Sequence, residues 1–178
     1  MFIVIVFIPN TVLAFNSFGF DRRSGFDRYT LLPSSGATII KAKNLAFVII
    51  VSVPVFPIIL LMIWRLGVSS GVFGLIEAAS LAASYLSCGN LMSITYPARM
   101  QFFRFAPSTG ALPEIIAGLI FSSLPGLLLV YVWRAAAGHA IWAVPLILIG
   151  CVTLYFFTAN WSGKRFEQRR EKIADSVS

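Results

Sequence analysis

Charged residues are scarce in this chain. Only 12% of its 178 residues are Asp, Glu, Lys or Arg, and 58% are hydrophobic. A soluble globular domain carries about 25% charged and about 45–50% apolar residues. The chain therefore lacks the polar residues that a water-facing shell needs, and its composition indicates a membrane protein.

Residues that build common catalytic and metal sites are few as well. The chain has two cysteines, Cys88 and Cys151, both inside apolar runs, and one histidine, His139. Without a CxxC pair, neither a disulfide framework nor a zinc site is predicted. The sequence also lacks a phosphate-binding G-x-x-x-x-G-K-[ST] loop, an HExxH motif and a GxSxG motif. We predict no catalytic residue and no metal here, so a membrane enzyme is the weakest hypothesis.

Five apolar runs predict an all-α fold, a polytopic membrane helix bundle. A helix needs about 20 mainly apolar residues to cross a bilayer. The first run is shorter and reaches about 22 Å, against a hydrocarbon core about 30 Å thick. We expect it to be the end of a spanning helix whose beginning is missing, which gives five visible spans of six. The predicted membrane domain covers residues 1–161, with spans at about 1–15, 45–66, 72–94, 115–134 and 140–158, and a charged tail follows at 162–178.

The fourteen Lys and Arg residues are distributed unevenly between the segments that join these runs. The first loop, the third loop and the tail hold five, two and five of them, whereas the other two loops hold one each. Because cytoplasmic loops are enriched in Lys and Arg, we predict that the first loop, the third loop and the tail are cytoplasmic in a bacterial plasma (inner) membrane. The same rule accounts for the net charge of +7, so no nucleic-acid partner is predicted.

One span carries an acid. Glu77 lies in the run at 72–94, and an ionisable residue in a membrane helix marks a substrate or ion path by default. Alternatively, Glu77 reaches interfacial water or pairs with Arg65 or Arg134. The same run is rich in small and hydroxyl residues, which suit helix packing. The candidate residues of a transport path are Glu77, Ser84 and Asn90.

The longest polar interval, residues 16–44, combines basic residues with aromatic ones. Phe18 and Phe20 are expected to be exposed, and Phe26 follows them. Charge together with aromatic anchors is typical of a surface that docks on a soluble partner. Alternatively, these rings lie among lipid headgroups as an amphipathic interfacial segment.

The order of residues in this loop is an acid, a basic pair, a glycine, a Leu-Leu-Pro turn and a lysine before the next span. This order resembles the cytoplasmic loop of the ABC-2-type permeases, the membrane subunits of one class of ATP-binding-cassette (ABC) transporters. The stretch NLMSITYPAR at 90–99 is similar to loops of large bacterial permeases of this type. Phe26 departs from the family, which has a small hydroxyl residue after the glycine.

The resemblance implies a short coupling helix in the loop at 16–44 that docks on a separate ABC ATPase subunit. ATP and Mg would be bound by that partner and no cofactor by this chain, which would pair with a second permease half or form a homodimer in the lipid bilayer. We thus predict the permease subunit of an ATP-driven exporter; the alternative is a membrane anchor or assembly protein without a transport path. The residues expected to couple to the partner are Asp21, Arg22, Arg23, Gly25, Phe26, Asp27, Arg28, Pro33 and Lys43.

Overall fold

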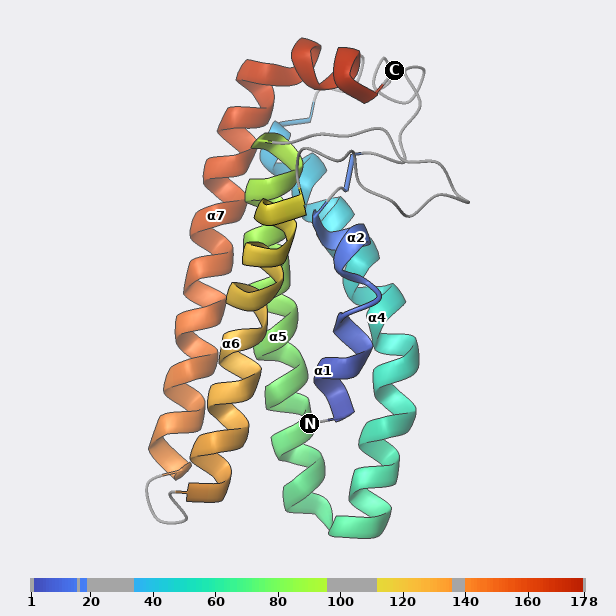
Figure 1. Ribbon diagram of the computed structural model, residues 1–178, viewed down its shortest axis with the longest axis vertical. Helices are drawn as coiled ribbons and strands as arrows, with labels where there is room; N and C mark the ends of the chain where they lie inside the picture. The colour runs from blue at the N-terminus through green and yellow to red at the C-terminus, as the bar shows by residue number, and fades with distance from the viewer. Residues whose placement is uncertain (1, 16, 19–33, 96–111, 136–139, 178) are drawn as a thin grey trace.

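The computed structural model describes residues 2–15, 17–18, 34–95, 112–135 and 140–177, and all its regular elements are helices (Figure 1). The prediction of an all-α fold is thus confirmed, and four of the helices are long and apolar enough to cross a membrane, as a membrane-inserted protein requires. The helices are α1 (Phe2–Phe7), α2 (Thr11–Phe15), α4 (Gly36–Leu66), α5 (Val68–Thr95), α6 (Leu112–Ala135) and α7 (Ala140–Val177).

Helix α5 is the centre of the bundle and contacts each of the other helices named above. Of its most apolar 18-residue stretch 61% is buried, against 17–22% for the other three long helices. Small residues allow this close packing. Gly89 lies directly against the Ala14 carbonyl of α2, and Gly126 of α6 lies against the Leu81 side chain. Helices α4, α6 and α7 therefore present most of their apolar surface outward, as lipid-facing helices do.

The first apolar run differs from the spanning segment that was predicted. It forms two short helices, α1 and α2, because Pro9 has no N–H with which to continue the first one. Neighbouring side chains bind backbone carbonyls at the break: Asn10 Nδ2 donates to the Val6 carbonyl (2.8 Å), and Thr11 Oγ1 donates to the Ile8 carbonyl (2.6 Å). The described residues thus contain four long apolar helices and one broken segment.

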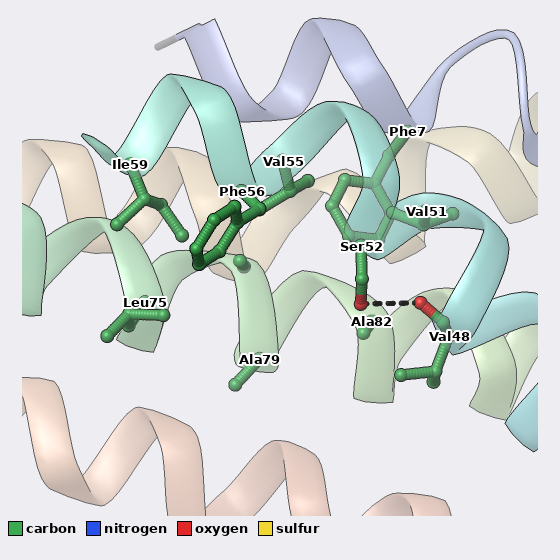
Figure 2. Close-up of a pocket in the computed structure, with 11 residues that line it drawn as sticks. Phe7, Val48, Val51, Ser52, Val55, Phe56, Ile59, Leu75, Ala79 and Ala82 are labelled. Carbon is green, nitrogen blue, oxygen red and sulfur yellow. Dashed lines mark hydrogen bonds between the residues drawn. The ribbon is translucent and has the colours of Figure 1, made fainter. Parts of the chain in front are cut away.

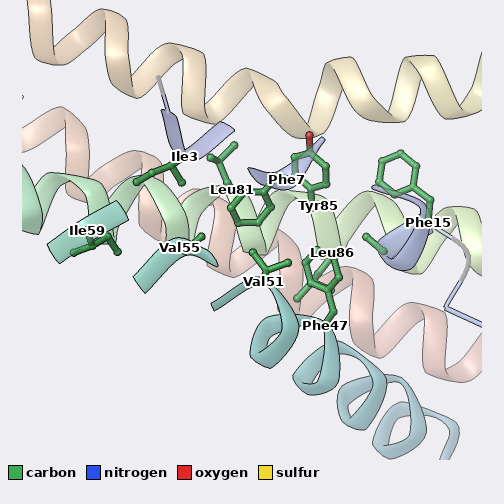
Figure 3. Close-up of a cluster of buried hydrophobic side chains, with 11 residues drawn as sticks. Ile3, Phe7, Phe15, Phe47, Val51, Val55, Ile59, Leu81, Tyr85 and Leu86 are labelled. Carbon is green, nitrogen blue, oxygen red and sulfur yellow. The ribbon is translucent and has the colours of Figure 1, made fainter. Parts of the chain in front are cut away.

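This broken segment is part of the main hydrophobic core. In Figure 3, Ile3, Phe7 and Phe15 lie in one cluster with side chains of α4 and α5. The ring of Tyr85 lies between two of them, with centroids 5.2 Å from Phe7 and 6.1 Å from Phe15. Burial of these large side chains packs one face of α1 and α2 against α4 and α5, whereas Ile5 and Ile8 are exposed. The core cluster also includes Phe47, Val51, Val55, Ile59, Leu81 and Leu86.

Two helices extend beyond the predicted spans. Helix α4 begins at Gly36 rather than near residue 45, because Ser35 caps it by accepting a hydrogen bond from the Thr38 N–H (3.3 Å). Its 31 residues are about 46 Å long, so one end extends beyond a hydrocarbon core of roughly 30 Å. At the other boundary, the last predicted span and the tail form one continuous helix, α7, whose final part turns across the end of the bundle (Figure 1).

The described helix ends that border the three basic segments lie at the same end of the bundle. Figure 1 places the start of α4, the end of α5, the start of α6 and the end of α7 together, and we call this the tail end. Helices α4 and α5 meet at the opposite end, the turn end, through Gly67, whose φ of 91° favours glycine. The described borders of the Lys- and Arg-rich parts of the sequence are therefore on one side of the bundle.

Candidate coupling site and buried polar residues

The predicted coupling residues fall mostly outside the described residues, and only Lys43 lies within them. The structure does describe both borders of the segment at 19–33. These borders contact α4 and α7, and we call the contacting group the loop base. The eight predicted coupling residues that lie outside the described residues are Asp21, Arg22, Arg23, Gly25, Phe26, Asp27, Arg28 and Pro33. The loop base consists of Ser17, Phe18, Gly36, Lys43, Gly163, Phe166 and Glu167.

The border before the segment is held by Lys43 and Phe166. Lys43 Nζ donates to the Ser17 carbonyl (2.8 Å) and lies 4.8 Å from the centroid of the Phe18 ring, a cation–π geometry. On α7, the Phe166 ring stacks on Phe18 with centroids 4.8 Å apart and planes inclined by 9°. Both rings are fully buried, in a cluster with Ile39, Ile40, Ile94 and Ile173.

The border after the segment is held by α7 as well. The Gly36 N–H donates to Glu167 Oε1 at 2.7 Å, across 131 positions of sequence. A carboxylate is favoured there because the first turn of a helix has free N–H groups and a positive partial charge. The two backbones approach so closely that a Cβ on Gly36 would lie 2.5 Å from the Gly163 carbonyl oxygen. Both borders of the loop are thus fixed to the same part of α7.

The prediction for Phe18 was wrong, since the ring is buried rather than exposed. Its partner, Phe166, comes from the tail that would otherwise be assigned to solvent or the membrane interface. The signal in the sequence was the spacing of Phe166 and Ile173, seven positions apart, which puts both on one face of a helix. The roles of Gly163 and Glu167 depend on where α7 crosses α4 and carry no local signal.

Glu77 is buried deep in the bundle, with 1% of its surface exposed. It lines a cavity of about 370 Å³ at the turn end, between α1, α4, α5 and α6. Arg134, one of its two predicted partners, lines the same cavity. The other, Arg65, places its guanidinium 4.4 Å from the centroid of the Trp64 ring. Except for Ser70, the rest of the lining is apolar: Ile3, Met62, Leu66, Phe73, Val130 and Trp133.

Ser84 and Asn90 lie elsewhere on α5. Ser84 lines a larger groove of about 950 Å³ between α5, α6 and α7, where its Oγ donates to Cys151 Sγ at 3.9 Å. Asn90 is 3% exposed, and its Nδ2 has no hydrogen-bond partner within the described ranges. From Glu77 to Asn90 the helix rises about 20 Å, so the three residues share one buried helix but not one cavity.

A third cavity lies between α4 and α5 and is smaller, at about 240 Å³ (Figure 2). Small side chains of α5, including Ala79 and Ala82, leave this space beside Phe7. The one hydroxyl in the lining, Ser52, donates to the Val48 carbonyl of its own helix (2.7 Å). Such a lining suits hydrocarbon rather than a polar reaction.

Neither the family models, the curated proteins nor the solved structures with which the chain was compared include a match. Within the part of the chain that the structure describes, no group of three or more His, Cys, Asp or Glu residues could hold a metal ion. The loop base and the buried polar residues of α5 are therefore the features of the structure that bear on function.

Proposed function

We propose that this chain is the permease subunit of an ATP-driven ABC exporter, coupled to a separate ATPase subunit through the segment at 19–33. The broken α1–α2 segment would be a fifth membrane element beside the four long helices. The tail end would face the cytoplasm of a bacterial cell, because the helix ends that border the basic segments lie there. The observation that carries the proposal is the loop base, which ties both borders of the proposed coupling segment to α4 and α7.

The contacts of the loop base are suited to transmit a movement of the coupling segment to the helices. A displacement of the segment at 19–33 would reach α4 through Gly36 and Lys43, and α7 through Phe166 and Glu167. Helices α4 and α7 both contact α5. Closure of the ATPase subunits would then shift two outer helices against the central helix, which carries the buried polar residues. Packed helices respond to such a push by discrete shifts rather than by continuous deformation.

The first test is recovery of the partner. The tagged full-length chain is purified from its native membrane in mild detergent, and Mg-dependent, vanadate-sensitive ATP hydrolysis is measured in the eluate. The coupling variant replaces residues 21–28 by Gly and Ser. Its matched control, Arg65→Gln, removes one positive charge at the turn end.

We expect the wild type and the control to retain ATP hydrolysis, and the coupling variant to lose at least about tenfold, the equivalent of 1.4 kcal/mol of binding. Equal hydrolysis by the coupling variant would refute docking through this segment. Absence of an ATPase from the wild-type eluate, even after chemical cross-linking in the membrane, would refute the transporter itself.

A further inference from the structure

The final part of α7 has two different faces. One face is buried on the tail end of the bundle through Phe166 and Ile173, which are 0% and 1% exposed. The other face is exposed and basic. Four cations of this face stand at positions i, i+1, i+5 and i+8, a spacing that places them on one side of a helix. This basic face consists of Lys164, Arg165, Arg169 and Lys172.

The basic face begins about two turns beyond Phe157, which is in the lipid-facing part of α7. Phe156 and Phe157 are 52% and 70% exposed, as expected for side chains against acyl chains. Trp161 follows, at the level where indole rings mark the membrane interface. The Arg165 guanidinium lies 5.2 Å from the centroid of the Trp161 ring, and the helix then turns across the end of the bundle (Figure 1). The cations therefore lie at the level of the lipid headgroups.

The acids of this segment do not neutralise the face. The Glu167 carboxylate is engaged by the Gly36 N–H at the loop base. Residues 164–172 carry five bases and two acids, a net charge of +3. The basic face thus offers positive charge beside the membrane surface.

We propose that the basic face binds anionic phospholipid headgroups of the leaflet at the tail end, and so holds the loop base at the bilayer surface. Lipid is favoured over a soluble protein because the neighbours of this face are Trp161 and the exposed phenylalanines of the spanning part of α7. Near an anionic surface, each Lys or Arg strengthens binding about fivefold. The proposal does not depend on the transport function.

Trp161 provides a built-in reporter. The other tryptophans, Trp64, Trp133 and Trp142, lie near the helix ends that meet the turn end. Replacing these three by Phe leaves Trp161 as the only indole. The full chain is reconstituted in phosphatidylcholine vesicles that contain either dibrominated phosphatidylglycerol or dibrominated phosphatidylcholine. The ratio of the two quenching efficiencies measures the preference for the anionic headgroup next to Trp161.

We expect quenching to show at least a fivefold preference for phosphatidylglycerol at low salt, falling toward one in 1 M salt because screening weakens exposed charge interactions. The variant K164Q/R165Q/R169Q/K172Q should abolish the preference, and R169Q/K172Q should reduce it if the fourfold variant does not insert. Arg65→Gln at the turn end should leave it unchanged.

Equal quenching by both lipids in the wild-type background would overturn the proposal, as would a preference that survives both Gln variants. Loss of ATPase recovery in the Gln variants, without any lipid preference in the wild type, would assign the basic face to a protein partner instead. That outcome would overturn lipid binding and leave the proposed transport function standing.

Discussion

Gly36 of α4 and Gly163 of α7 lie at the point where the two helices cross, and neither position has room for a side chain. A Cβ on Gly163 would lie 2.6 Å from the backbone of Ala37. We predict that Gly163→Ala forces the helices apart and lowers the free energy of unfolding by about 1–3 kcal/mol, the usual cost of overpacking. Thermal unfolding of the purified protein in detergent measures the change.

Gly150, in the same helix, is the matched control. A Cβ there meets nothing within 4 Å, so Gly150→Ala should leave the stability unchanged or raise it slightly, because alanine favours a helix more than glycine does. If both substitutions changed the melting temperature alike, the close crossing would have no role in stability.

Among the described elements, α5 buries the largest set of polar side chains: Glu77, Ser80, Ser84, Ser87, Asn90 and Ser93. If α5 lines a transport path, Glu77→Gln should change the basal ATP hydrolysis of the reconstituted complex about tenfold, which corresponds to roughly 1.4 kcal/mol in the barrier. The yield of protein in the membrane should stay the same, since Gln preserves the size of the side chain.

Ser87 provides a control on the same helix. It is buried as deeply as Glu77, but its hydroxyl donates to the Ala83 carbonyl within α5 (2.7 Å). Ser87→Ala should therefore leave ATP hydrolysis unaltered. An anchor or assembly protein without a path predicts that Glu77→Gln and Ser87→Ala are equally silent, and this result would favour that alternative.

At the level of whole helices, some features can be predicted well from the sequence and others poorly. Long apolar runs identify the four long helices because length and hydrophobicity are local properties. The start of α4 and the end of α7 could not be predicted in the same way, since residues 36–44 and the tail contain charged residues and are held by contacts such as Gly36 with Glu167. In the first run, Pro9 was visible, but its consequence, two short helices, depends on packing against α4 and α5.

In the candidate sites, too, some features follow from the sequence and others depend on tertiary contacts. That Glu77, Ser84 and Asn90 share a helix follows from their spacing, whereas their separation into different surroundings depends on which neighbours α5 meets. Phe18 was assigned to the surface because its partner ring comes from the opposite end of the sequence. Composition alone cannot indicate such a pairing.

For the whole molecule, the helix ends that border the basic segments lie together at the tail end, and this predicts a single orientation. In a Cys88→Ala/Cys151→Ala background, Ser69→Cys places an exposed thiol at the turn end, and Gln168→Cys places one at the tail end. We expect a membrane-impermeant maleimide to label Ser69→Cys in intact cells and Gln168→Cys only after permeabilisation.

A denatured sample labelled at both positions serves as the control for thiol reactivity. Labelling in the reverse order would place the basic segments outside the cell and would exclude coupling to a cytoplasmic ATPase. Labelling of both positions in intact cells would indicate a mixed topology, which the uneven distribution of Lys and Arg argues against.

The loop base also has a consequence for biosynthesis. Gly36 and Glu167 are 131 positions apart. At about 5–20 residues per second, the ribosome adds Glu167 roughly 7–26 s after Gly36. During that interval the segment at 19–33 has emerged, but its borders lack their α7 contacts. A partner that recognises the assembled loop base would therefore bind only chains whose synthesis has passed Glu167, and incomplete chains would be left out of the complex.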